Sequence, residues 1–345
     1  MKKINLEPPG AFNETSLSYL IPKSKSNNYF YKNGHASLID RIKVKVNTDI
    51  IECKLLWNKF SPNKSIFDDW DFRLAWHQGY NYIPYFYTLY NGDEPVGFLP
   101  LCFNSQNKRY EWWGTNWMED CDIYVNDERI VDLLFFIAPS PLHLNAVKVK
   151  YIDKIAKFGK IKEDDKKNTK LINKFRTLDE LLNSFKKKCR YNLKSSCAYI
   201  NSLNPRVIKT VGSENRLIDK LINMNISQFD TGLPEDESDL ALPARANTYR
   251  NMVANSGKNY QAKFIEVYIQ DTLAAIDFIL IYKDIYYTIK GGNQLKKFNG
   301  IGNYIIYLEF EDALSLNMST INSLQVDYGW KHRYFDQEPL YIFEK

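Results

Sequence analysis

The chain has 345 residues, of which 44% are hydrophobic and 25% are charged, and its formal net charge is +5. This is the balance of a globular protein, and the charge is far smaller than that of a dedicated nucleic-acid binder. The apolar runs are too short to span a bilayer, and the N-terminus lacks the apolar core of a signal peptide.

The cysteines and histidines do not indicate a metal site. The five cysteines are scattered without a C-x-x-C pair, and the four histidines are scattered as well, so no zinc site can be assembled from spacing. Buried free thiols in a reducing compartment are the simplest interpretation. We therefore expect a cytoplasmic protein with no metal and no membrane span.

The first half of the chain is expected to fold as helices followed by an antiparallel sheet. Apolar residues recur at helical spacing over 49–60 and 71–78, and aromatic, β-prone segments follow. Asn91-Gly92-Asp93 is a strong hairpin turn between two of these segments. The expected strands cover 42–46, 82–90, 96–103, 109–113, 122–125 and 146–152, and a further helix covers 128–138.

The second half repeats this order. A charged stretch over 157–170 is interpreted as a linker or an exposed loop between the halves, which predicts domains at 1–160 and 161–345. A capping box from Thr177 to Glu180 begins a helix that is expected to reach about Tyr199. The later expected helices cover 214–229, 244–255 and 303–315, and the expected strands cover 206–211, 263–270, 273–282, 285–290, 323–328 and 340–343.

The most informative segment is a Gly-x-Gly turn between the strand at 285–290 and the helix at 303–315. Two glycines one residue apart let backbone N–H groups approach a bulky anion, and the helix N-terminus adds partial positive charge. This pattern predicts a phosphate-binding turn, with a plain chain reversal as the alternative. The residues assigned to it are Lys296, Lys297, Asn299, Gly300, Ile301, Gly302 and Asn303.

These features resemble the GNAT superfamily of GCN5-related N-acyltransferases, in the branch with two tandem GNAT-like halves that includes Fem-type aminoacyltransferases and CelD-like acyltransferases. Residues 297–302 fit the family signature Arg/Gln-x-x-Gly-x-Gly/Ala, with Lys in the first position. Residues 95–101, 112–114 and 326–329 are similar to further motifs of the branch. The Tyr-Lys pair common in this branch is absent, because Phe335 follows Tyr334.

The resemblance implies an α/β (α+β) fold of two tandem GNAT-like halves, each a mixed, mostly antiparallel sheet flanked by helices. The first half is expected to hold a degenerate cofactor site. The implied function is acetyl-CoA- or other acyl-CoA-dependent N- or O-acyl transfer to an amino sugar, amino acid or small amine, with a small molecule or glycan precursor as acceptor. A Fem-type aminoacyltransferase that uses aminoacyl-tRNA and a non-catalytic GNAT-like binding module are the alternatives. The oligomeric state stays open.

The resemblance also implies which residues flank the donor. Tyr287, on the strand before the turn, is the favoured hydrogen-bond donor or proton relay, with core packing as the alternative. Asp327 and Tyr328 end the strand after the helix, where Asp327 is expected to act as a base, to orient the acceptor or only to cap the strand. Lys331 is the nearby lysine and completes the expected catalytic set.

Four more residues are assigned to substrate binding. Asp277 lies inside an apolar strand and is either exposed at an edge or an acid of shifted pKa in the cleft. His332 is a candidate base or a surface imidazole, and Trp112 and Trp113 line an acceptor pocket or pack in the core. Residues 186–191 form a basic patch, which is either a solvated helix face or a contact for phosphates, an anionic glycan or lipid, or RNA.

Overall fold

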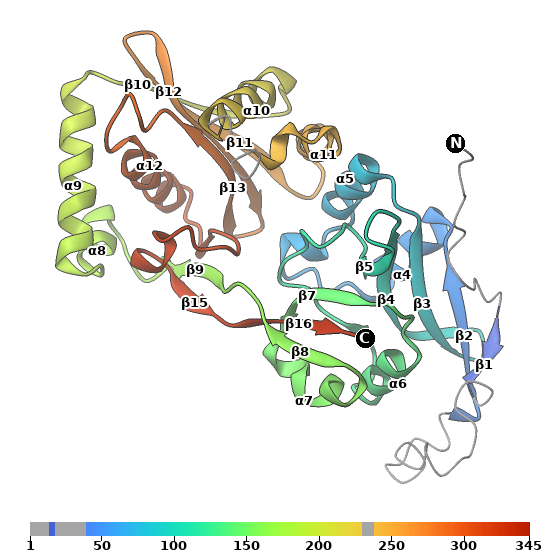
Figure 1. The fold of residues 1–345 in the computed structure, drawn as a ribbon. Helices are drawn as coiled ribbons and strands as arrows, with labels where there is room; N and C mark the ends of the chain where they lie inside the picture. The colour runs from blue at the N-terminus through green and yellow to red at the C-terminus, as the bar shows by residue number, and fades with distance from the viewer. Residues whose placement is uncertain (1–13, 18–38, 230–237) are drawn as a thin grey trace. The chain divides into compact units, whose positions relative to one another are not determined.

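The computed structural model describes residues 14–17, 39–229 and 238–345, and these residues form two compact units (Figure 1). The first unit contains the described residues up to 73, residues 81–164 and the C-terminal residues 340–345. The second contains residues 74–80 and 165–339. The chain therefore crosses between units at 164/165 and returns its last strand to the first unit. Most of the N-terminal segment lies outside the described residues.

The first unit is built on an antiparallel sheet in which neighbouring strands follow the order β1-β2-β3-β4-β5, and β6 pairs with β4. The predicted hairpin is confirmed, with Asn91 opposite Glu94 and Gly92 in the left-handed region at φ 63°. The strands are β1 Thr15–Ser16, β2 Ile42–Asn47, β3 Pro84–Asn91, β4 Glu94–Asn104, β5 Arg109–Trp112 and β6 Tyr124–Val125.

Helices and a smaller sheet complete this unit. Asp49 caps the first helix by accepting hydrogen bonds from the backbone of Ile51 and Glu52. The smaller sheet has the order β7-β16-β8. The bounds are α4 Ile50–Phe60, η2 Ile66–Asp68, α6 Arg129–Ile137, β7 His143–Lys148, η3 Val149–Tyr151, α7 Ile152–Ile155, η4 Ala156–Phe158, β8 Lys160–Glu163 and β16 Leu340–Glu344. Helix α5 Trp70–Tyr80 begins in this unit, and its residues 74–80 belong to the second unit.

The second unit is built on a sheet with the order β10-β11-β12-β13-β14-β9-β15. All neighbouring pairs are antiparallel except β13 and β14, which are joined through a helix and run parallel. The strands are β9 Lys167–Leu171, β10 Arg206–Val211, β11 Gln261–Ile269, β12 Thr272–Tyr282, β13 Ile285–Asn293, β14 Thr320–Asn322 and β15 Asp336–Glu338.

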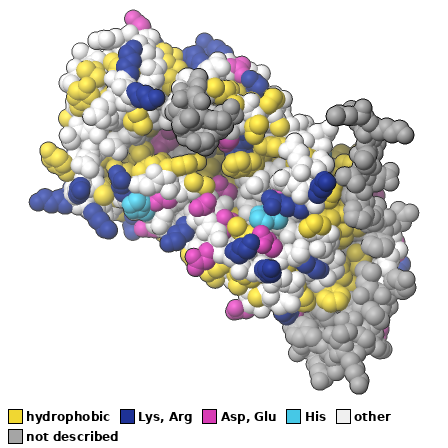
Figure 2. Space-filling view, in the orientation of Figure 1, with side chains coloured by type: hydrophobic (Ala, Val, Ile, Leu, Met, Phe, Trp, Pro, Cys, Tyr) yellow, Lys and Arg dark blue, Asp and Glu magenta, His cyan; other side chains and the backbone are white. Residues whose placement is uncertain are grey.

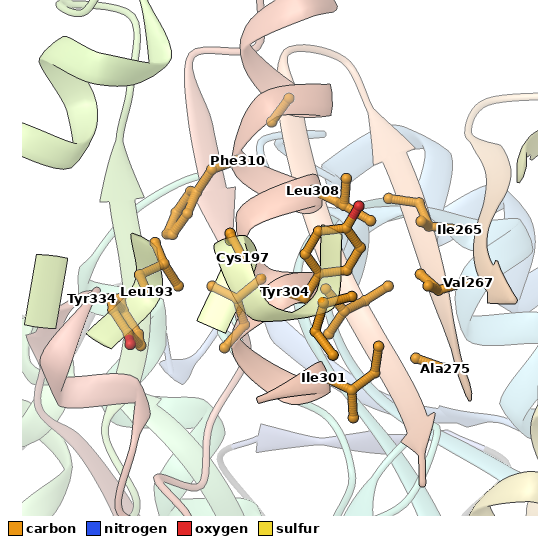
Figure 3. Close-up of a cluster of buried hydrophobic side chains, with 14 of the residues drawn as sticks. Leu193, Cys197, Ile265, Val267, Ala275, Ile301, Tyr304, Leu308, Phe310 and Tyr334 are labelled. Carbon is orange, nitrogen blue, oxygen red and sulfur yellow. The ribbon is translucent and has the colours of Figure 1, made fainter. Parts of the chain in front are cut away.

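Helices cover both faces of this sheet, with α9 and α12 on one face and α10 and α11 on the other (Figure 1). On the first face, α9 and α12 share an apolar core with β11 and β12 (Figure 3). On the second face, the rings of Tyr249 and Phe278 lie 6.1 Å apart. The helices are α8 Leu178–Asn183, α9 Lys187–Ser202, α10 Asn215–Phe229, η6 Asp239–Ala241, α11 Pro243–Ala254, α12 Ile301–Ser315 and η7 Lys331–Arg333.

The expected α/β architecture is confirmed, but two local predictions are wrong and a third holds only in part. The expected helix from Thr177 is interrupted at Lys186, whose backbone is not helical. The expected linker or loop at 157–170 contains the crossing between the units at 164/165, but it is not irregular, because β8 and β9 pair with neighbouring strands. The expected strand at 323–328 is not formed, because Leu324 and Val326 take left-handed conformations at φ 63° and 56°.

Candidate functional site

The Gly-x-Gly turn connects β13 to α12, as the sequence predicts. Its first residues fold back, so that the backbone N–H groups of Lys297 and Phe298 donate to the carbonyl of Gln294 at 3.0 and 2.9 Å. The Phe298 ring is buried and anchors the turn in the core. Gly300 is the N-cap residue of α12 and has φ 84°, a conformation that glycine adopts without the penalty paid by other residues.

The first turn of α12 is open to an anion. It contains no acidic residue, and no described acceptor receives a hydrogen bond from the backbone N–H groups of Gly302 and Asn303. A Cβ atom on Gly302 would meet only the Leu295 side chain within 4 Å, at 3.5 Å. Lys296 and Lys297 are exposed just before it. The turn therefore combines free N–H donors, positive charge and space.

Helix α9 lies against this turn, a neighbour that the sequence analysis missed. The amide of Asn303 donates to Ser196 Oγ at 3.0 Å, and Tyr334 donates to Asn303 Oδ1 at 3.3 Å. The Asn303 side chain is thus engaged in joining α9 and the segment near Tyr334 to α12. A Cβ atom on Gly300 would lie 3.0 Å from Ser196 Cβ. These contacts join residues far apart in the chain, and no motif signals them.

β13 and β14 separate partway along β13. They pair only from Ile285 opposite Thr320 to Tyr287 opposite Asn322. Just beyond, Thr288 Oγ1 donates to Ser323 Oγ at 3.2 Å, and the chain after Ser323 leaves the sheet. A register shift also marks β13 here, because Phe278 faces Lys290 while Ile279 faces Thr288, which leaves one extra residue in β13. Such bulges redirect backbone groups next to functional sites.

Asp277 is buried and does not lie at an exposed edge. It faces Glu309 of α12, and a hydrogen bond between the two carboxyl groups requires a proton bound by one of them. Burial raises the pKa of Asp277, although the hydrogen bond with Glu309 opposes this. Burial and the charge of Asp277 raise the pKa of Glu309 well above its usual range. The sequence indicates that Asp277 is a special position, but no local signal identifies Glu309 as its neighbour.

Asp327 has the geometry of a capping residue. Its carboxylate accepts hydrogen bonds from the backbone of Trp330 and Lys331, both at 2.8 Å, and lies 2.5 Å from His332 Nδ1. Partial burial would raise the pKa of Asp327, but the hydrogen bonds from His332 and the backbone outweigh it and lower the pKa to about 2. At neutral pH the group is an engaged carboxylate, which is unsuited to accept a proton.

The other assigned residues differ in accessibility. Lys331 is buried, and its ammonium group donates to the carbonyls of Ser323 and Gln325, so it supports the loop after β14. Tyr328 is 73% exposed, whereas Tyr287 is fully buried.

Trp112 and Trp113 are buried in the core of the first unit, where Trp112 Nε1 donates to the Asn145 carbonyl at 2.7 Å. The structure gives no support to a substrate contact by either tryptophan. Among the described residues, no group of three or more His, Cys, Asp or Glu is placed to hold a metal, and no helix is long and apolar enough to cross a membrane.

Comparison with known proteins gives a fold and no sequence family. No protein-family model and no curated protein matches the sequence. The structure resembles that of FemX, with 9% identity, a TM-score of 0.54 and coverage of 86% of this chain and 96% of that one. It also resembles a tandem GNAT protein from the clavulanic acid biosynthesis pathway, with 8% identity and a TM-score of 0.51. That match covers 88% of this chain and 97% of the other.

A conserved protein of unknown function from Bacteroides thetaiotaomicron gives 11% identity and a TM-score of 0.55, with coverage of 87% of this chain and 99% of that one. At these identities the likeness concerns the fold alone. The chain therefore has a GNAT-like fold, similar to the fold of a tandem GNAT protein.

Proposed function

We propose that the protein is a GNAT-type acyl- or aminoacyltransferase that binds the anionic part of its donor at the N-terminus of α12 in the second unit. The observation that carries the proposal is the open first turn at Gly302 and Asn303, which has no acidic side chain and whose N–H groups have no acceptor among the described residues. The fold shared with FemX and with a tandem GNAT protein supports it.

Acyl-CoA is the donor that we favour. Its diphosphate would lie against the N–H groups of Gly302 and Asn303, and Lys296 and Lys297 would add positive charge. Acyl-CoA would supply a thioester whose carbonyl carbon is attacked by an amine or hydroxyl of the acceptor. The C–S bond then breaks, and CoA leaves as a thiolate that takes up the proton lost by the acceptor. The protein's contribution is to hold both reactants in place where β13 and β14 separate, since orientation provides much of the acceleration in such transfers.

The separation of β13 and β14 also supplies polar groups near this position. Beyond Tyr287, β14 no longer pairs with β13, and the bulge near Ile289 redirects the backbone. We propose that a backbone N–H of this segment donates to the carbonyl oxygen as negative charge develops on it. An amino sugar, amino acid or other small amine is the proposed acceptor.

An aminoacyl-tRNA donor is the second candidate, and α9 is the observation that favours it. This helix carries Lys187, Lys188, Arg190 and Lys194 and no acidic residue, and Tyr191 is 71% exposed beside them. Figure 2 shows Lys and Arg side chains gathered at the edge of the second unit where α8 and α9 meet. Such a surface suits phosphates and stacked bases.

Calorimetric titration with CoA and acetyl-CoA tests the proposal, and Gly302 offers a matched pair of variants. Gly302→Glu adds a negative charge, which is stabilised by the helix N-terminus but repels a diphosphate. Gly302→Gln has nearly the same size without the charge. We expect the parent to bind, the Glu variant to lose binding at least tenfold relative to the Gln variant, and both variants to remain folded.

Two results separate the alternatives. Equal binding by the Glu and Gln variants would remove the phosphate assignment at α12. Absence of CoA binding by the parent, together with binding of an aminoacyl-tRNA that weakens when Lys187 and Lys188 are both changed to Glu, would replace the first donor with the second.

A further inference from the structure

The buried face of α12 carries a carboxyl pair that the phosphate-binding turn does not explain. Asp277 of β12 and Glu309 of α12 are 8% and 4% exposed and face each other. Oδ1 of Asp277 and Oε1 of Glu309 are sealed from solvent and receive no hydrogen bond from any described N–H or O–H donor. A hydrogen bond between the two carboxyl groups therefore needs a proton that the pair itself binds.

The fold makes room for this contact. Asp277 lies opposite Gly291 in the ladder between β12 and β13. A Cβ atom at Gly291 would be 2.5 Å from Oδ1 of Asp277, so any larger residue there would displace the carboxyl group. The pair joins the central strand β12 to α12 from the side of the sheet that also bears the turn at Gly300.

The surrounding charges favour one negative charge on the pair. Lys331 of η7 is the cation that acts on Glu309, and Asp312 is the neighbouring acid on α12. Asp312 is already engaged by Lys263 at 2.7 Å and by the Tyr286 hydroxyl at 3.1 Å. One shared proton leaves one negative charge to face Lys331. Two ionised carboxylates in contact at a buried site would repel each other strongly.

We propose that Asp277 and Glu309 are a proton-sharing positioning pair, which holds α12 in place while protonated and loosens the helix and its N-terminal anion site when the proton is lost. The effect on the anion site rests on the proposed function. The effect on the helix does not, because it concerns the packing of α12 against β12.

The sign of the pH dependence follows from linkage. In the unfolded chain both carboxyl groups are ionised above about pH 4.3, while the folded pair retains a proton because burial raises both pKa values. The stabilisation is therefore complete below the unfolded pKa values and is lost as the pH rises through the raised folded values. Each pH unit in that window changes the opening equilibrium by up to about tenfold.

Hydrogen exchange of the α12 amides in the full chain tests this, with opening constants corrected for the intrinsic exchange rate. In the parent, opening should increase by up to about tenfold per unit between about pH 5 and the raised Asp277 pKa of about 7. Asp277→Asn keeps the shape and donates a permanent hydrogen bond to Glu309. We expect this variant to lose most of the pH dependence of α12 opening.

A matched control is available on β11. Glu266 is also buried, but it pairs with Lys220 at 2.7 Å and accepts from Tyr268 at 2.7 Å. Glu266→Gln should retain the parental pH dependence of α12. If Asp277→Asn does not fold, Glu309→Gln provides the same test from the other side of the pair. An α12 pH dependence that is unchanged in the Asp277→Asn or Glu309→Gln variant overturns the proposal.

The effect of the pair on ligand binding is measured separately, as the CoA affinity at each pH. CoA affinity of the parent should fall over the same pH range, whereas the affinity of Asp277→Asn should stay nearly constant. A protein that binds no CoA at any pH would contradict the donor assignment while the exchange result still decides the role of the pair. CoA binding with the same pH profile in parent and variant would refute the link between the pair and the anion site.

Discussion

The two glycines of the turn should respond differently to alanine. Gly300 has φ 84°, and a Cβ atom there would lie 3.0 Å from Ser196 Cβ. Gly302 lies inside the first turn of α12, and a Cβ atom there would meet no atom closer than 3.5 Å. The same substitution therefore introduces backbone strain and crowding at the first position and only improves helix propensity at the second.

The expected magnitudes follow from these environments. A left-handed conformation costs an alanine about 1–2 kcal/mol, and the close contact with Ser196 adds to this loss. Alanine in place of glycine within a helix contributes up to about 1 kcal/mol. We therefore expect Gly300→Ala to destabilise the second unit by at least about 1 kcal/mol and Gly302→Ala to leave it unchanged or more stable.

Urea titration of the full chain, with hydrogen exchange reporting the second unit separately, measures both effects. Each variant serves as a control for the other, because the same substitution is made at two sites that lie two residues apart in one turn. Shifts of the same sign and size in both variants would refute the assignment of Gly300 as the conformational glycine and Gly302 as the open one.

Three further changes test individual contacts. Trp113→Ala should destabilise the first unit by about 3–5 kcal/mol in thermal unfolding, since it removes a fully buried ring; unchanged stability would contradict its place in the core. Lys331→Met should cost about 1–3 kcal/mol in urea unfolding of the second unit, because the carbonyls of Ser323 and Gln325 lose their donor. Asp327 has a pKa lowered to about 2, so its stabilisation is present above about pH 3.9 and is lost as the pH falls toward 2. Asp327→Asn should reduce this acid sensitivity in a pH titration of stability, and an unchanged acid transition would argue against the capping role.

Local signals explain how much of the fold could be predicted from the sequence. The hairpin at Gly92, the N-cap at Thr177 and the turn at Gly300 depend on residues within a few positions of one another, and all three are present. The strand expected at 323–328 was wrong because the apolar pattern cannot show that Leu324 and Val326 are left-handed. Tertiary contacts hold that loop in place, including the ammonium group of Lys331.

Only the part of the candidate site that is formed by residues close together in the sequence could be predicted. The turn and its lysines follow from spacing, whereas the contacts of Ser196 with Asn303 and of Glu309 with Asp277 join segments that only the folded chain brings together. A lone acid in an apolar strand signalled that Asp277 needs a partner, but the partner's identity depends on the register of α12 on β12. The roles proposed for Tyr287 and Lys331 stay predictions, although burial of both side chains favours support of the site over direct contact with substrate.

The most direct test of the central claim is hydrogen exchange of the full chain with and without CoA, read at the amides of residues 299–304. We expect CoA to slow exchange at Gly302 and Asn303, and we expect no such protection in the Gly302→Glu variant. Protection confined to other segments, or equal protection in parent and variant, would contradict donor binding at the N-terminus of α12.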